Sequence, residues 1–307
     1  FSSVLLPLLV STAEGCGGFD WHDEAFEHAY AELEESLFRG RHAYAAIAPL
    51  VGISTQSQVE LAGGIRVRVA APGELASLWP EANGLLPQDF GREPDRLCVL
   101  ELERPLPPGS GEPPDAPGEL SDAVTALRLA TAGAIAAGPV LFERLDWRPF
   151  GVRPILPIAG TKPEGEETRL DRFRGRLAGD LLERLALADE DPELGEALDR
   201  WELSLFQAEP FRSEQLREAL SALLGENDGL WAAATRAAVL LGENGGERAE
   251  IHAVLGGERI PADLVRRAIV EALMHGNRPA LVATLDESLL GLRPRPAGYF
   301  ALRAAAG

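Results

Sequence analysis

Short segments in the first half of the chain alternate apolar and polar residues, a pattern typical of half-buried strands. Ile65, Val67 and Val69 alternate with two arginines within residues 58–70, and a pair of glycines just before them indicates a turn or bulge. Residues 96–103 have the same character and predict a second strand.

Two further strands are predicted at residues 126–133 and 139–147, where alanine and glycine dilute the apolar signal. Residues 104–122 are rich in proline and glycine and contain no apolar cluster whose burial could offset the entropy lost on ordering. We interpret them as a surface loop, with an interdomain linker as the alternative. Ahead of the strands, residues 19–38 space their apolar side chains as a helix does.

From about Glu166 onward, apolar residues recur every three or four positions, which predicts helices almost without interruption. Asp191 is a predicted N-cap with Pro192 at the first helical position. Six or seven short helices joined by short loops indicate a bundle. The predicted fold class is α+β, with a mixed α/β region at residues 1–160 and an all-α helical bundle at residues 166–307.

The ends and the cysteines suggest where the protein acts. The chain begins at Phe1 rather than methionine, so we expect a fragment or a processed chain. The apolar segment at residues 2–10 is far too short to span a bilayer, and a buried strand or helix start is favoured over the remnant of a signal peptide. Cys16 and Cys98 are far apart, which favours free thiols in a reducing cytoplasm.

The net charge of −19 argues against broad contact with nucleic acid phosphates or with an anionic membrane. It leaves room for a small, local basic site. The sequence contains no P-loop, no G-x-G-x-x-G after a strand, no H-E-x-x-H and no G-x-S-x-G, which removes the commonest nucleotide-binding and hydrolase motifs.

Histidines near the N-terminus could imitate a metal site. His22 and His28 lie beside Asp23 and Glu24, but a spacing of six residues puts the two imidazoles on different faces of a helix. We therefore favour a solvated, acidic helix start and predict neither a metal nor another cofactor.

The stretch "RRAIVEALMHG" carries the residue types that metal-independent RNA cleavage needs. Histidine is the side chain suited to proton transfer near neutral pH, so His275 could take that role, while Arg266 or Arg267 could stabilise the charge that develops on the phosphate. Glu271 and His275 are four residues apart, and without a third ligand we interpret them as a helix-surface pair.

Several helical segments together resemble the Apea-type HEPN proteins of bacteria. They comprise residues 197–225, 229–242 and 265–276, and include an apolar helix, a turn and an alanine-rich helix that ends in Leu-Leu-Gly. The segment "AIAPLVGI" ahead of "VELAGGIRVRV" is similar to the start of that family's β region. The likeness covers most of the chain.

The resemblance implies an RNA-binding or RNA-cleaving module that forms a homodimer and serves in a defence or toxin-type role. By the family signature, which is Arg, four to six residues, then His, the catalytic residues would be His275 with Arg267 or Arg266. Here seven residues separate Arg267 from His275 and eight separate Arg266, and Ala268 is apolar where the family often has a polar residue. An offset of eight positions rotates two side chains by about 80° around a helix.

Two interpretations of this stretch stay open. The first is a metal-independent endoribonuclease with a degenerate site, in a protein that binds RNA or a protein partner. The second is a non-catalytic dimerisation or interaction module, in which the arginines are solvated and His275 interacts with the helix dipole ahead of Gly276. A small-molecule binder with a groove between the two regions is a third class. We predict neither DNA nor a membrane as a partner, and a cytoplasmic location.

Overall fold

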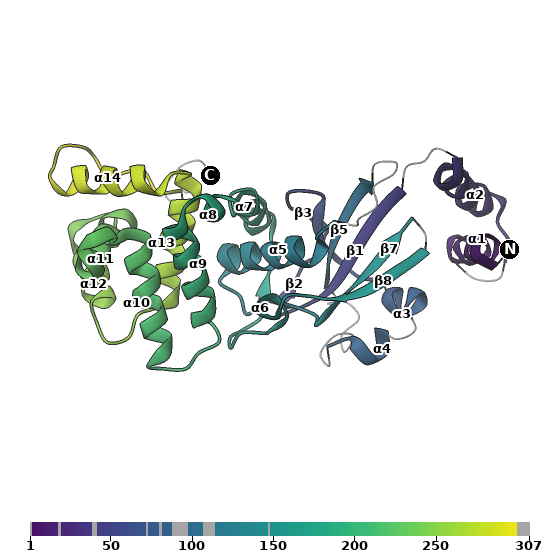
Figure 1. Cartoon of the computed structure of the whole chain (residues 1–307), viewed down its shortest axis with the longest axis horizontal. Coiled ribbons are helices and arrows are strands. Elements are labelled where there is room, and N and C mark those ends of the chain that lie inside the picture. The colour runs from purple at the N-terminus through teal and green to yellow at the C-terminus, as the bar shows by residue number, and fades with distance from the viewer. Residues whose placement is uncertain are drawn as a thin grey trace.

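The computed structural model describes residues 2–17, 20–38, 42–71, 73–79, 82–87, 98–106, 114–146 and 148–299. Figure 1 shows a hairpin of two helices at one end, a twisted sheet in the middle and a group of helices at the other end. The fold is mixed α+β, as the sequence predicts at this coarse level. No helix in these ranges is both long enough and apolar enough to cross a membrane.

The N-terminal hairpin consists of α1 (Ser2–Gly15) and α2 (Asp23–Phe38). The two helices share a small core of their own, made of Leu8, Ala29 and Leu33. The apolar N-terminal segment is therefore the start of a helix, and the helix predicted from residues 19–38 is confirmed.

A seven-stranded sheet with antiparallel pairing forms the middle of the molecule. Its strands follow the order β3-β4-β5-β1-β7-β8, with β6 also paired to β1. Their bounds are β1 (His42–Val51), β3 (Val59–Glu60), β4 (Ile65–Val69), β5 (Cys98–Leu106), β6 (Ala136–Ala137), β7 (Val140–Leu145) and β8 (Arg148–Pro154). The strands predicted from residues 58–70, 96–103 and 139–147 are confirmed, whereas the central strand β1 was not identified.

The two faces of the sheet have different coverings. Tyr44, Ala46 and Leu50 of β1 belong to the main core, whereas Ile47 points to the opposite face and packs in a second cluster with Trp79. The short helices α3 (Glu74–Leu78) and α4 (Ala82–Leu85) contribute to this second cluster. A short parallel pair, β2 (Ile53–Ser54) with β9 (Thr168–Arg169), lies apart from the sheet.

The strand predicted at residues 126–133 is wrong, because this segment is the end of helix α5 (Ala116–Thr131). The predicted loop at residues 104–122 is also corrected, since α5 begins inside it and residues 107–113 lie outside the described ranges. Asp115 caps the helix by accepting a hydrogen bond from the Gly118 amide. Even the polar residues of α5, such as Ser121 and Thr125, are buried, so the helix lacks the polar face that normally reveals an amphipathic helix.

Helices dominate after β9, as predicted. They are α7 (Arg172–Leu182), α8 (Leu187–Glu190), α9 (Pro192–Ser204), α10 (Phe211–Leu224), α11 (Gly229–Leu241), α12 (Gly245–Leu255), α13 (Ala262–His275) and α14 (Arg278–Leu289), with α6 (Pro157–Gly160) before β9 and a 3-10 turn at Glu226–Asp228. Asp191 accepts a hydrogen bond from the Leu194 amide with Pro192 in the first turn, which confirms the predicted cap. One continuous core joins these helices to the sheet, and the division into domains at residues 160–166 stays a prediction.

A buried ion pair connects the sheet layer to the helices. Arg128 on α5 donates from Nη1 to Glu202 on α9 at 2.7 Å, and their side chains are only 1% and 9% exposed. Thr125 donates to the same carboxylate at 2.8 Å. The Arg128 guanidinium also donates to the carbonyl oxygens of residues 135, 158 and 161, so it joins the connection after α5 to α6 and α9.

We expect Glu202→Gln to lower the free energy of unfolding by about 3–5 kcal/mol, because Arg128 would keep its charge in a buried place without a carboxylate. Urea unfolding followed by circular dichroism measures the loss. The matched control is Glu196→Gln on the same helix, which removes an exposed partner of Arg200 and should cost about 1 kcal/mol or less. Equal losses in the two variants would contradict a special role for the buried pair.

A second charged network lies on the sheet face that carries α3. The Glu101 carboxylate, 3% exposed, accepts hydrogen bonds from Arg66 at 2.9 Å and from Arg68 at 2.5 Å. Arg68 also binds Glu74 at the start of α3. Burial alone would raise the pKa of Glu101, but the hydrogen bonds and charges of the two arginines lower it below its ordinary value.

This lowered pKa predicts a loss of stability in acid. Because the pKa of Glu101 is lower in the folded than in the unfolded chain, its contribution is complete above the unfolded value of about 4.3 and disappears as the pH falls through the folded value. The difference in unfolding free energy between the wild type and Glu101→Gln should thus be largest at neutral pH and shrink below about pH 4. Urea titrations at several pH values test this, and a difference that grows in acid would contradict it.

Candidate functional site

The residues that the family signature singles out all lie on α13. Arg266 donates from Nε and Nη2 to Asp263 at 2.9 and 2.7 Å, and from Nη1 to the Leu129 carbonyl at the end of α5. Its side chain is 11% exposed. Arg266 is therefore engaged in holding α13 to α5, rather than in a solvated or open catalytic position.

His275 is the last residue of α13 and is exposed. Its Nδ1 donates to the Asn277 carbonyl at 3.0 Å, and Gly276 ends the helix in the left-handed conformation with φ 78°. An imidazole at this place interacts favourably with the negative end of the helix dipole.

The structure does not bring His275 together with Arg266. Since α13 is continuous from Ala262 to His275, the offset of nine positions puts these two side chains on opposite sides of the helix, about 180° apart. Arg267 is half-buried and lies about 12 Å along the axis from His275, rotated by about 80°. In the described residues, no contact joins either arginine to His275, so one chain alone does not form the Arg–His pair.

Glu271 is not the helix-surface partner of His275 that its spacing suggested. Its side chain is buried, and its Oε2 accepts a hydrogen bond from the Tyr299 amide at 2.7 Å. Tyr299 in turn approaches Asp180 on α7 at 3.4 Å. We call residues 290–299 the C-terminal segment. The hydrogen bond between Glu271 and the Tyr299 amide holds this segment against α13.

A hollow lined by Gly276 and Asn277, the residues that follow His275, is acidic. It has a volume of about 350 Å³ and lies between the start of α9 and the end of α13, where Glu190, Asp191 and Glu193 line it. The guanidinium of Arg278, which also lines this hollow, is neutralised by Asp191 at 2.9 Å and by Glu193 at 3.2 Å. A phosphate group would be repelled here.

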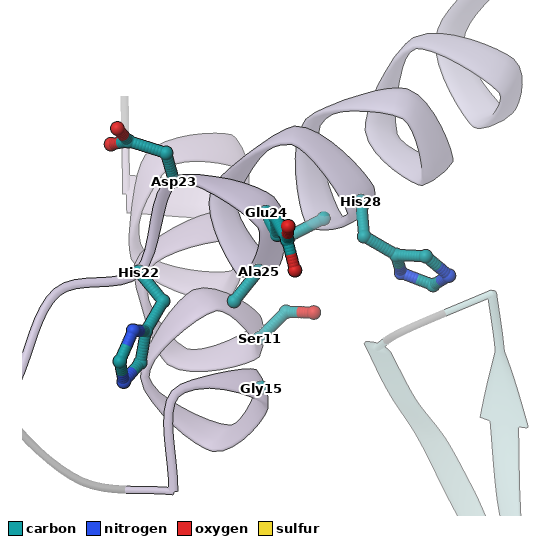
Figure 2. Close-up of a pocket in the computed structure, with 8 residues that line it drawn as sticks. Ser11, Gly15, His22, Asp23, Glu24, Ala25 and His28 are labelled. Carbon is teal, nitrogen blue, oxygen red and sulfur yellow. The ribbon is translucent and has the colours of Figure 1, made fainter.

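The N-terminal histidines line another hollow, but they do not converge. Figure 2 shows the rings of His22 and His28 pointing in different directions, with the Asp23 carboxylate turned away from both. Asp23 accepts a hydrogen bond from Trp21 at 2.8 Å, and His28 lies 3.7 Å from Glu32. Within the described ranges, no three histidine, cysteine or acidic side chains gather into a group that could hold a metal ion.

A basic pocket lies between α11, α12 and the C-terminal segment. Its volume is about 520 Å³, and it is lined by Thr235, Ala238, Val239, Arg248, Ala249, His252, Ser288, Leu289, Arg293, Pro294 and Arg295. None of these lining residues is acidic. Three guanidinium groups and one imidazole therefore share a pocket on a chain whose net charge is −19.

The backbone carbonyl of Gly242 organises this pocket. It lies at the C-terminus of α11 and accepts hydrogen bonds from Arg248 Nε at 3.2 Å and from Arg295 Nη1 at 2.6 Å. The carbonyl end of a helix attracts cations, which helps to hold both guanidiniums side by side. Each guanidinium has five N–H donors, so one bond to Gly242 leaves most of them for a ligand.

An exposed aromatic residue stands beside the pocket. Trp231 on α11 is 72% exposed, and its ring meets the ring of His252 edge to face, with centroids 6.1 Å apart. The Trp231 carbonyl accepts a hydrogen bond from Thr235, the next residue on this face of α11. Trp231 thus extends the basic pocket with a flat apolar surface.

Sequence reasoning missed this pocket, although part of its signal was visible. Arg248 and His252 are four residues apart in a helical segment, a spacing that puts them on one face. Arg293 and Arg295 come from residues after α14 and reach the pocket only through the tertiary fold. Nothing in their local sequence indicates that they meet Arg248.

Comparisons with protein-family models, with curated proteins and with solved structures find no match to this chain. The resemblance to the HEPN family consequently stays a prediction, and so does the role of the residues on α13.

Because Glu271 fastens the C-terminal segment, we expect Glu271→Ala to loosen residues 290–299. The Tyr299 amide would lose its carboxylate acceptor, which should destabilise the docked segment by about 1–3 kcal/mol. Hydrogen–deuterium exchange should show faster deuterium uptake in peptides that cover this segment. Glu250→Ala, an exposed change on α12, is the control, and unchanged uptake in Glu271→Ala would refute the anchoring role.

Proposed function

We propose that this protein is a HEPN-like RNA-binding protein and that it binds single-stranded RNA in the basic pocket between α11, α12 and the C-terminal segment. The observation that carries the proposal is the gathering of Arg248, Arg293, Arg295 and His252 in one pocket of an otherwise acidic chain. Guanidinium groups suit phosphate because their planar N–H donors can bind two oxygens at once.

The exposed ring of Trp231 favours binding of single-stranded RNA over binding of an RNA duplex. Bases of single-stranded nucleic acids stack on aromatic side chains, whereas the bases of a duplex are already stacked on one another. Since the basic surface is confined to one pocket, binding should involve few phosphates and depend only moderately on salt.

The proposal does not include RNA cleavage by the residues on α13. Arg266 is occupied by Asp263 and the Leu129 carbonyl, and His275 stands at the far end of the helix beside an acidic hollow. These contacts favour the interpretation of α13 as a structural and interaction element over that of a ribonuclease site within one chain.

Trp231→Ala should weaken binding of a short single-stranded RNA by roughly five- to a hundredfold, because one stacking partner is worth about 1–3 kcal/mol. Fluorescence anisotropy of an RNA labelled at its 3′ end measures the dissociation constant. As matched controls, Trp21→Ala removes an exposed tryptophan from the N-terminal hairpin, and His275→Ala removes the signature histidine. Both controls should bind like the wild type, and an unchanged constant in Trp231→Ala would refute the proposed site.

A further inference from the structure

We propose that the basic pocket selects a phosphomonoester, with a terminal phosphate held by Arg248 and Arg295 and the attached base stacked on Trp231. The ligand class is a nucleotide with a terminal phosphate, either free or at the end of an RNA. The RNA form of the ligand rests on the proposed function, whereas recognition of the phosphate itself does not.

Charge is the first argument for a monoester. Arg248 and Arg295 hydrogen-bond to the same neutral oxygen of Gly242, so two positive groups lie side by side. Among the described residues, neither of them forms an ion pair with a carboxylate. A terminal phosphate carries close to two negative charges at neutral pH and offers three oxygens, whereas an internal phosphodiester carries one charge. The dianion thus matches the guanidinium pair better.

Most other buried arginines of this chain are paired with carboxylates. Arg128 binds Glu202, Arg236 binds Asp286, and Arg278 binds Asp191, so each of these buried or half-enclosed guanidiniums has its own carboxylate. Arg184 and Arg217 also donate only to backbone carbonyls. Within the described residues, however, Gly242 is the one residue whose carbonyl accepts from two arginines, so two unpaired guanidiniums lie together only here. An anionic ligand would supply the missing negative charge.

Shape is the second argument. The pocket volume of about 520 Å³ lies within the range of small-molecule sites. His252 lines the pocket and contacts the Trp231 ring, so the aromatic surface adjoins the pocket at His252. A phosphate on the guanidiniums and a planar base against Trp231 therefore suit the two kinds of surface that meet here, one charged and one aromatic.

A third guanidinium, that of Arg293, stands at the rim. It pairs with Glu287 at 3.0 Å, and the side chains of Arg293 and Glu287 are 63% and 43% exposed. An exposed pair of this kind contributes little to stability. Arg293 can consequently leave Glu287 for a phosphate oxygen without a large cost to the fold.

The experiment compares ligands that differ only in the terminal phosphate. Adenosine 5′-monophosphate and adenosine are titrated into the full chain, followed by calorimetry. A short oligoadenylate is then tested with a 5′-phosphate, with a 3′-phosphate and with hydroxyl groups at both ends. We expect the monophosphate to bind and adenosine not to bind measurably, and at least one phosphorylated oligonucleotide to bind about tenfold or more tightly than the unphosphorylated one.

Two variants test the residues. Arg295→Gln keeps an N–H donor for the Gly242 carbonyl but removes the charge, and it should abolish most of the preference for the phosphorylated ligand. Circular dichroism and hydrogen exchange show whether Arg295→Gln loosens the C-terminal segment. If it does, Arg293→Gln at the rim is the second test. It should reduce the preference for the phosphorylated ligand without altering the fold. Arg176→Gln, an exposed change of the same charge on α7, should leave it intact.

The outcomes separate this inference from the proposed function. Equal binding of all three oligonucleotides would overturn the phosphomonoester inference while RNA binding stands. Binding of adenosine 5′-monophosphate without any oligonucleotide would support the inference, with a free nucleotide as the ligand, and overturn the RNA function. If neither the nucleotide nor any oligonucleotide binds, both proposals fail.

Discussion

The ion pair between Arg128 and Glu202 is the constraint on which the arrangement of the molecule depends. A buried guanidinium needs acceptors for its N–H donors, and Arg128 makes four hydrogen bonds, to Glu202 on α9 and to the carbonyls of residues 135, 158 and 161. This requirement fixes α5 against both the sheet and the helices that follow. From α9 the packing continues through α10 to α11 and α12, which carry part of the basic pocket.

The fold could be predicted from the sequence wherever one face of an element is exposed. The alternation in residues 65–69 and the apolar stripes of the later helices gave correct elements, because solvent imposes polar residues on the other face. The signal failed for α5 and β1, which are buried on nearly all sides. Burial of polar groups such as Arg128 inside α5 removed the periodicity that distinguishes a helix from a strand.

The candidate site was harder to predict because its parts are far apart in the sequence. The predicted site combined three residues of one helix, Arg266, Arg267 and His275. Helix geometry places both arginines away from the histidine. Arg248 and His252 do share a helix face, whereas Arg295 joins them only after the chain has passed through α13 and α14. A local motif can therefore indicate Arg248 and His252, whereas only the tertiary structure shows that Arg295 joins them.

Arg248 approaches the end of α11 so closely that position 242 has no room for a side chain. The backbone angles of Gly242 are extended and would by themselves allow any residue. A β-carbon at this position would lie 2.8 Å from Cγ of Arg248 and 2.9 Å from the Ala238 carbonyl oxygen, too close for any side chain. The glycine is needed for space, and the arginine six residues later fills that space. A Leu-Leu-Gly helix end followed at this interval by arginine is therefore a pattern by which the same pocket could be sought in other sequences.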